Sequence, residues 1–258
     1  MGRVHAFEFE DLKWFPRNLR NYATDFLRFG ANRFDLYKPV ISIIQKGIEH
    51  AGNNTIVDIA SGGGGGLIKI ASHLKETNPV LKIILSDYYP NHAAFESTKR
   101  MMPETFEYVF ESVDAMAMPP SLKGLRTQFL SFHHFRPEQA KAILQNAIDS
   151  QQPIAIFEGQ QRNLKSMIPM LLSPFTVLFT TPFIRPFKFG RIVFTYLIPV
   201  IPLFIMWDGI ISVLRTYTVE ELNTMILELS HYDQFVWEVG IAKGQPVNVG
   251  YLLGVPRK

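Results

Sequence analysis

The feature that most constrains this chain is residues 55–66, TIVDIASGGGGG, where an apolar run ending in an acid leads into five consecutive glycines. A backbone with so many positions that lack a Cβ usually makes room for something pressed against it. The glycines lead into LIKIASHLKE, whose apolar residues recur at helical spacing. The sequence therefore predicts a strand, a glycine turn and a helix, with backbone N–H groups available to a nucleotide-like ligand.

A second acid follows the next predicted strand. The segment LKIILSDYYPN indicates a buried strand followed by Asp87, and an acid in this place accepts both hydroxyls of a ribose. The glycine spacing differs from the G-x-G-x-x-G turn of nicotinamide-binding folds, because Gly62 and Gly64 are followed by Leu67. Asp58 also precedes the first glycine by four residues. The pattern therefore argues against a dinucleotide.

An acid, three residues and then a run of glycines resembles the first motif of the class I S-adenosylmethionine-dependent methyltransferases. It stands here as Asp58-Ile59-Ala60-Ser61-Gly62-Gly63-Gly64. The resemblance continues through Asp87 and through VDAMAMP, and it covers residues 55–160 well and the end of the chain loosely. Many members of the family have glycine where Ala60 stands, so the approach of the cofactor to the turn differs slightly here.

The resemblance implies S-adenosylmethionine as cofactor, with Asp87 on the ribose and Asp114 near the adenine. The residues that it places at the cofactor are Asp58, Ala60, Ser61, Gly62, Gly64, Asp87, Tyr88, Asp114 and Ala115. Each of the three acids taken singly has an alternative interpretation as a helix cap or a solvated turn residue. Their occurrence in order, each at the end of an apolar run, favours the cofactor site.

Strand-like and helix-like segments alternate along the chain, as in a parallel sheet covered on both faces. FEYVFESVD, RTQFLSFHHF and PIAIFEG are typical of the third, fourth and fifth strands, and FVWEVGIAKG with VNVGYLLGVP of an antiparallel hairpin at the sheet edge. Asn91 and Thr218 stand where helices need caps, and Glu221 completes a capping box with Thr218. We predict an α/β fold: a seven-stranded, mostly parallel, doubly wound Rossmann-like sheet with an antiparallel edge strand.

The chain divides into an N-terminal helical cap, residues 1–54, and a methyltransferase domain, residues 55–258, with a hydrophobic lid or insertion at residues 160–215 after the fifth strand. In the family resembled, such a cap commonly covers the cofactor or substrate side; plain packing on the sheet is the equal alternative. Prolines interrupt both uncharged stretches of the insertion, 166–184 and 192–207, and a spanning helix needs about twenty apolar residues. We therefore expect short helices.

So many apolar side chains would hardly stay in water, since burying one Leu or Phe contributes about 1.5 to 3 kcal/mol. The insertion is a lid packed on its own domain, a membrane-docking surface or substrate tunnel, or, least favoured, a true membrane span. Basic residues that could attract anionic headgroups are Arg162, Lys165, Arg185, Lys188 and Arg191.

Composition narrows the classes of partner. The 258 residues are 47% hydrophobic, which suits a single enzyme-sized domain. A net charge of +3 without a dense basic run gives no argument for nucleic acid. No cysteine occurs, and neither a metal motif nor a secretory signal is recognisable, so we expect no metal and a cytoplasmic location, with a peripheral place at the inner face of a membrane as the alternative.

Methyl transfer from a sulfonium needs the acceptor positioned, water excluded and, for some acceptors, a proton removed. Candidates at strand ends are His133, His134 and Glu158, and His133 is favoured as base, with the two histidine side chains expected on opposite sides of a strand. Asp208 follows sixteen uncharged residues. It is either exposed at a turn made by Gly209 or held at the lip of an apolar pocket, where it orients an acceptor.

These observations predict an S-adenosylmethionine-dependent methyltransferase that acts on a hydrophobic or lipid-like small molecule, at an oxygen. One alternative is an enzyme that uses the same cofactor for aminocarboxypropyl transfer or cyclisation. The other is a non-catalytic, membrane-associated protein with this fold.

Overall fold

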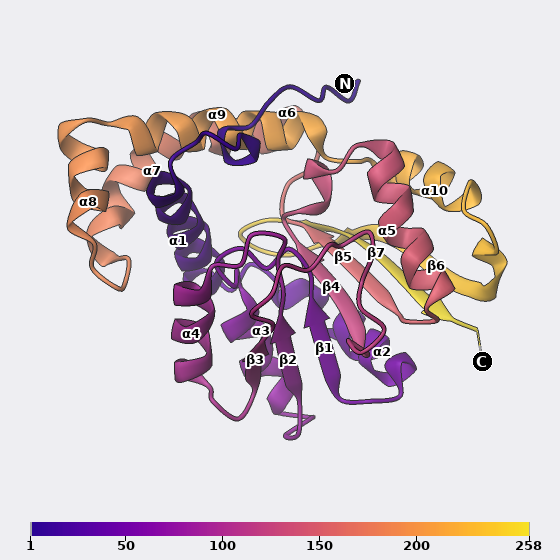
Figure 1. The fold of residues 1–258 in the computed structure, drawn as a ribbon. Coiled ribbons are helices and arrows are strands. Elements are labelled where there is room, and N and C mark those ends of the chain that lie inside the picture. The colour runs from indigo at the N-terminus through magenta and orange to yellow at the C-terminus, as the bar shows by residue number, and fades with distance from the viewer. Residues whose placement is uncertain (1, 258) are drawn as a thin grey trace.

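A seven-stranded sheet lies at the centre of the computed structural model, which describes residues 2–257 (Figure 1). Its strands are β1 (Thr55–Asp58), β2 (Lys82–Leu85), β3 (Phe106–Tyr108), β4 (Leu125–Phe129), β5 (Ile154–Glu158), β6 (Phe235–Ala242) and β7 (Val249–Pro256). They lie in the order β3-β2-β1-β4-β5-β7-β6, and β7 runs antiparallel to both of its neighbours. The predicted fold class is confirmed, with the reversed strand one position in from the edge.

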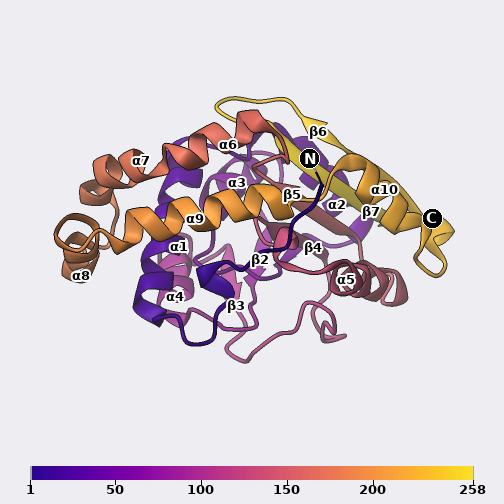
Figure 2. The same cartoon turned by 90° about the horizontal axis from the view of Figure 1, so that it is seen from above.

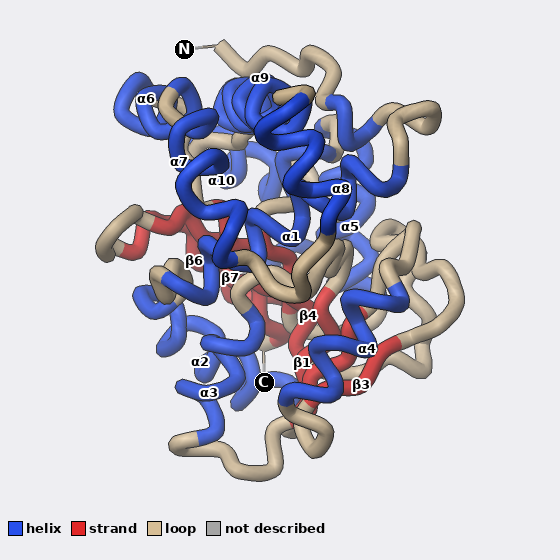
Figure 3. The backbone as a smooth tube through the Cα atoms, turned by 90° about the vertical axis from the view of Figure 1, so that its left-hand side faces the viewer, coloured by secondary structure: helices blue, strands red, loops and turns tan. Residues whose placement is uncertain are grey.

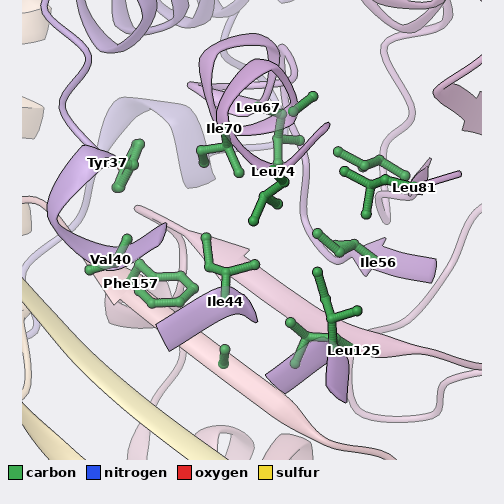
Figure 4. Packing of buried hydrophobic residues seen from close by; sticks show 14 of the residues in the cluster. Tyr37, Val40, Ile44, Ile56, Leu67, Ile70, Leu74, Leu81, Leu125 and Phe157 are labelled. Carbon is green, nitrogen blue, oxygen red and sulfur yellow. The ribbon is translucent and has the colours of Figure 1, made fainter. Parts of the chain in front are cut away.

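Helices cover both faces of the sheet because the central strands are apolar on both sides. Ile56 packs with α2 (Ile41–Ala51) and α3 (Leu67–Lys75), and the next residue, Val57, points to the opposite face. That opposite face is covered by α5 (Pro137–Asp149) and α10 (Val219–Leu227). Figure 4 shows the first cluster, in which Ile44 and Leu74 contribute from the two helices.

The predicted helix caps are confirmed. Asn91 Oδ1 accepts a hydrogen bond from the backbone N–H of Ala94 at the start of α4 (His92–Met101). Thr218 and Glu221 form the capping box of α10. Both caps are local in sequence, which is why spacing alone predicted them.

Two strand predictions are too long. β3 stops at Tyr108, and β4 stops at Phe129. The backbone of Leu130 has a φ of 50°, in the left-handed region, so the extended conformation of β4 cannot continue. The chain turns there into a 3-10 turn, Phe132–His134, which holds both histidines.

The insertion consists of α6 (Leu164–Leu171), α7 (Ser173–Thr180), α8 (Phe189–Ile192) and α9 (Val200–Arg215). These helices lie beyond the carboxyl ends of the strands, with α9 crossing above the sheet (Figures 1 and 2). The prediction of short helices is confirmed. In residues 2–257 no single helix has the length and apolarity to cross a bilayer, although two pairs of helices bent at their breaks meet both measures together.

The two helices of the N-terminal region pack against different parts of the protein. Helix α2 packs in the core against the sheet, whereas α1 (Arg17–Arg33) lies with the insertion (Figure 3). Ala23 of α1 joins Phe15, Val177 and Phe204 in a separate apolar cluster. Asp25 of α1 also binds two basic residues of the insertion, Lys188 and Arg191, each at 2.7 Å.

Candidate functional site

The glycine turn follows β1 and uses its glycines in two ways. A Cβ on Gly66 would lie 2.6 Å from the Tyr37 ring, and one on Gly63 would lie 3.3 Å from Thr24, so these two glycines let the N-terminal region pack closely. A Cβ on Gly65 would meet nothing within 4 Å, and one on Gly62 only Thr24 Cγ2 at 3.9 Å. The turn is therefore open to a ligand along one side only.

Left-handed backbone conformations shape the same turn. Gly62 and Gly64 have φ values of 54° and 82°, which glycine adopts without steric cost. Ala60 also has a positive φ, 53°, at the position where glycine is usual in the resembled family. A Cβ on Gly64 would meet Thr98 Oγ1 at 3.1 Å, so Gly64 serves packing against α4 as well as turn geometry.

Asp58 is buried at the end of β1. Thr127 Oγ1 donates a hydrogen bond to Asp58 Oδ1 at 2.7 Å, and Ser61 Oγ donates to the Asp58 carbonyl oxygen at 2.9 Å. Burial, together with the neighbouring Asp87, raises the pKa of Asp58 to about 7, against the hydrogen bonds from Ser61 and Thr127 that lower it. The carboxyl group is thus poised between its neutral and charged forms near neutral pH.

Asp87 ties the first two strand ends together. Its Oδ2 accepts the backbone N–H of Gly62 at 2.8 Å, and its Oδ1 accepts that of Tyr89 at 2.8 Å. Its carbonyl oxygen accepts the N–H of Val113, the residue before Asp114, at 2.9 Å. Hydrogen bonds to Asp87 therefore connect the glycine turn after β1 with the segments that follow β2 and β3.

The remaining predicted cofactor residues lie around Asp87 and its hydrogen-bond partners. Asp114 Oδ1 accepts the N–H of Met116 at 2.9 Å and is partly exposed, whereas Ala115 is buried. Tyr88 is exposed, and its ring meets that of Tyr89 edge to face. The structure thus brings the predicted residues to one edge of the sheet; their contact with a cofactor stays a prediction.

His133 and Glu158 form a buried pair at the ends of β4 and β5. His133 Nδ1 lies 2.9 Å from Glu158 Oε2, and Gln160 Nε2 donates to the same oxygen at 3.1 Å. Because a carboxylate can only accept, Nδ1 carries a proton, and in the neutral imidazole the lone pair is therefore on Nε2. Within residues 2–257, His133 Nε2 is buried without a hydrogen-bond partner and lies 4.0 Å from Glu8 Oε1.

His134 lies beside His133, with ring centroids 4.4 Å apart. The prediction that the two side chains point to opposite sides is wrong, because the residues stand in a 3-10 turn. His134 Nδ1 lies 2.9 Å from Asp11 Oδ1 and 3.5 Å from Glu8 Oε2. Burial lowers the pKa of His134, but Glu8, Asp11 and Glu10 outweigh burial and raise the pKa to about 10.

Asp208 is buried inside α9, so the alternative that placed it exposed at a turn made by Gly209 is wrong. Asp208 Oδ1 and Oδ2 accept the backbone N–H groups of Phe9 and Glu10 at 2.8 and 3.2 Å. Burial raises the pKa of Asp208 to about 6, against these two hydrogen bonds. A Cβ on Gly209 would lie 2.8 Å from Met170 Sδ, so this glycine lets α6 pack on α9. A role of Asp208 in orienting an acceptor stays a prediction.

No sequence pattern indicated the N-terminal strap, which we define as residues 3–11. Arg215 Nη1 lies 3.2 Å from Glu8 Oε1, and Arg215 Nε donates to the carbonyl oxygen of Ala6 at 2.8 Å. Arg3 donates to the carbonyl oxygens of Arg215 and Phe135. These contacts join residues more than one hundred positions apart, so no local spacing reveals them.

A cavity of about 210 Å³ lies at the base of the insertion, between β5, β7 and α10. Its lining is mainly apolar and includes Phe132, Ile156, Tyr217, Ile241, Tyr251 and Leu252. Glu158 and Gln160 also line it. The cavity therefore reaches the carboxylate that holds His133.

Comparisons with known proteins agree with this architecture. No protein-family model matches the chain, and no curated protein matches its sequence. An O-methyltransferase family protein from Burkholderia thailandensis is 14% identical at a TM-score of 0.50, over 91% of this chain and 60% of that one. The O-methyltransferase NcsB1 from neocarzinostatin biosynthesis, solved with S-adenosyl-L-homocysteine and 1,4-dihydroxy-2-naphthoic acid, is 12% identical at a TM-score of 0.52, over 90% and 57%.

A Rhodobacter sphaeroides protein whose structure is named as that of a Zn-dependent alcohol dehydrogenase also matches, at 9% identity and a TM-score of 0.52, over 94% of this chain and 100% of that one. Measured against the two methyltransferases, this chain spans about three fifths of their length. Likeness at such identity establishes the fold, and the predicted class I methyltransferase fold is confirmed. The activity has to be argued from the site.

Proposed function

We propose that this protein is an S-adenosylmethionine-dependent methyltransferase that methylates an oxygen of a hydrophobic or lipid-like small molecule. The observation that carries the proposal is the set of contacts by which Asp87 joins the open side of the glycine turn to the segment that holds Asp114. Ligands of open α/β sheets bind beyond the carboxyl ends of the strands, where these residues stand.

The residues present fit this cofactor. Each oxygen of Asp87 accepts one backbone N–H bond, which fixes the carboxylate and leaves lone pairs for the two ribose hydroxyls. Asp114 is partly exposed for the adenine, and Tyr88 offers an exposed aromatic face. Asp58, Ala60, Ser61, Gly62, Gly64 and Ala115 complete the proposed cofactor site. When bound, the cofactor supplies an electrophilic methyl group on a sulfonium.

His133 is the proposed proton acceptor. Glu158 and Gln160 fix its ring and hold the proton on Nδ1, so Nε2 can take the proton of an acceptor hydroxyl as the new O–CH₃ bond forms. The mainly apolar cavity that reaches Glu158 supports a hydrophobic acceptor. NcsB1, which was solved with a naphthoic acid, is a structural neighbour whose ligand has this character.

His134 and Asp208 are proposed as positioning residues. His134 binds the Asp11 carboxylate, and Asp208 binds the first turn of the strap, so both hold residues 3–11 across the histidines. A strap held in this way excludes water from the proton acceptor.

The insertion is proposed to contact a membrane from one side. Many large apolar side chains of α6–α9 and their connections are exposed: Leu164, Ile168, Leu171, Leu172, Phe175, Phe179, Phe183, Phe187, Phe189, Leu197, Ile198 and Leu203. A surface of this extent marks an interaction site. Arg185 is exposed beside it, and basic residues near an anionic surface add about 1 kcal/mol each. A peripheral position would bring the cavity close to lipid-soluble acceptors.

Titration calorimetry with S-adenosylhomocysteine tests the cofactor, and product analysis tests the reaction. We expect saturable binding and, with an acceptor, S-adenosylhomocysteine as product. Methylthioadenosine as product would indicate aminocarboxypropyl transfer or cyclisation instead. Binding without turnover on any apolar hydroxyl compound would favour the non-catalytic alternative, and no binding at all would refute the proposal.

A further inference from the structure

We propose that Glu8, His133 and His134 form a binding site for a divalent transition-metal ion, between the N-terminal strap and the 3-10 turn after β4. This inference goes beyond the proposed function, and it departs from the expectation of no metal, which rested on the lack of a sequence motif. The ligands stand at positions 8, 133 and 134, so no motif spacing could have revealed them.

The geometry supports a three-ligand site. One ligand atom from each residue lies within 4.8 Å of the other two. His133 Nε2 is 4.0 Å from Glu8 Oε1, and His134 Nδ1 is 3.5 Å from Glu8 Oε2. A tetrahedral zinc ion with bonds of about 2.1 Å separates its ligand atoms by roughly 3.4 Å. The ligand atoms would therefore have to approach one another by up to about 1.4 Å, and His134 Nδ1 would exchange its 2.9 Å contact with Asp11 Oδ1 for the ion.

Two of the ligand atoms make no hydrogen bond within residues 2–257, although Glu8 Oε1 lies 3.2 Å from Arg215 Nη1. Among the described residues, Glu8 Oε1 and His133 Nε2 are buried and have no hydrogen-bond partner. The side chains of Glu8 and His133 are 2% and 3% exposed, so water does not satisfy these atoms from outside. A buried lone pair without a partner is unfavourable, and a single cation would satisfy both.

The outer contacts are those that orient metal-bound histidine. His133 Nδ1–H donates a hydrogen bond to Glu158 Oε2, which also accepts one from Gln160. A carboxylate that accepts the N–H of one ring nitrogen fixes the imidazole and directs the lone pair of the other ring nitrogen at the metal. His133 Nε2 is directed in this way toward Glu8.

The local charge also favours a cation. The carboxylates of Glu8, Asp11 and Glu158 surround the two rings, and Arg215 is the basic residue that faces Glu8 and Asp11. Two imidazoles and one carboxylate are the donor set of catalytic zinc sites, which keep a further position open. Because the ion would occupy the lone pair of His133 Nε2, the proposed proton acceptor would be available only in the metal-free protein, a consequence that rests on the proposed function, whereas the metal site itself does not.

The test uses the full chain, stripped with a chelator and titrated with Zn²⁺ by calorimetry, with metal content after dialysis measured by mass spectrometry. We expect one ion per chain and at least tenfold weaker binding in Glu8→Gln and in His134→Gln. His73→Gln is the matched control, because His73 Nε2 pairs with Asp35 Oδ2 at 2.7 Å elsewhere in the chain. Its affinity should equal that of the unmodified protein.

Circular dichroism shows whether each variant is folded, and His134→Gln keeps the test valid if Glu8→Gln unfolds. Substoichiometric zinc in the unmodified protein would overturn the metal site, as would equal affinity in the folded variants. S-adenosylhomocysteine binding, measured on the same stripped samples, reports separately on the proposed function. Its failure would leave the zinc result intact.

Discussion

Arg215 Nη1 lies 2.6 Å from Asp11 Oδ2, so the last residue of α9 binds the N-terminal strap across 204 positions of sequence. The same nitrogen lies 3.2 Å from Glu8 Oε1. A buried guanidinium shared by two carboxylates fixes the strap in place, and it shows that the insertion and the start of the chain form one unit above the sheet.

Replacing Arg215 by Met should destabilise the protein strongly. The variant leaves the buried Glu8 carboxylate without its cation, and breaking a buried pair in this way costs about 3–5 kcal/mol. Urea denaturation measures the loss. Arg100→Met is the control, because its pair with Glu96 lies at the surface and should contribute little to stability. Similar losses in the two variants would show that the strap contact does not stabilise the fold.

Replacing Asp87 by Ala should weaken S-adenosylhomocysteine binding at least about tenfold, or 1.4 kcal/mol. The change removes the proposed ribose acceptor and releases the backbone N–H groups of Gly62 and Tyr89. Calorimetry measures the affinity, with Asp149→Ala on the outside of α5 as the control. Unchanged affinity in a folded Asp87→Ala variant would place the cofactor elsewhere.

The raised pKa of Asp58 predicts a pH dependence of stability. Between about pH 4 and 7 the folded protein keeps a proton that the unfolded chain has released, so the free energy of unfolding should fall as pH rises through this window. For a rise from 3.8 to about 7 the change is on the order of 4 kcal/mol. Urea midpoints should depend less on pH in Asp58→Asn, which keeps an acceptor for Thr127. If the urea midpoints of Asp58→Asn and the unmodified protein changed with pH in parallel, this would argue against a neutral Asp58.

Replacing His133 by Ala should lower methyl transfer by about 10²- to 10⁴-fold, the usual contribution of a positioned base. S-adenosylhomocysteine affinity should change little, because His133 contacts Glu158 rather than the glycine turn. Single-turnover assays give the rate, and Glu158→Gln should lower it with an altered pH profile if Glu158 positions the ring. Full activity in His133→Ala would remove this residue from the mechanism.

Exchanging Phe179 and Phe183 for Ser should weaken binding to vesicles that contain anionic lipid. Both side chains are largely exposed, and burying each in lipid contributes about 1.5 to 3 kcal/mol. Flotation at low and high salt measures the bound fraction, and binding should fall with salt. Val177→Ala, a buried change in the same helix as Phe179, is the control. A protein that never floats would show that the insertion does not dock on membranes.

Local sequence patterns predicted much of this structure. The strand before Asp58, the glycine turn and the caps at Asn91 and Thr218 each depend on residues within a few positions of one another. The pattern could not reveal that Gly63 and Gly66 accommodate Thr24 and Tyr37, because that packing is decided by α1 and the turn after it, roughly thirty to forty positions earlier in the chain.

The candidate site was less predictable for the same reason. The positive φ of Leu130 ends β4 early and places both histidines in one turn, although leucine gives no warning of a left-handed conformation. Glu8 and Asp11 reach that turn only because Asp208 and Arg215 bind the strap from α9. Such long-range polar contacts have no signature in spacing or hydropathy.

The hydrogen bonds from the Phe9 and Glu10 amides to Asp208 couple the movement of the strap to that of α9. If α9 lifted from the sheet with these hydrogen bonds intact, Phe9 and Glu10 would move with Asp208, and the first turn of the chain would come away with the helix. Access to the histidines and release of the amino-terminal segment are therefore one movement, and a ligand that stabilises either part will slow both.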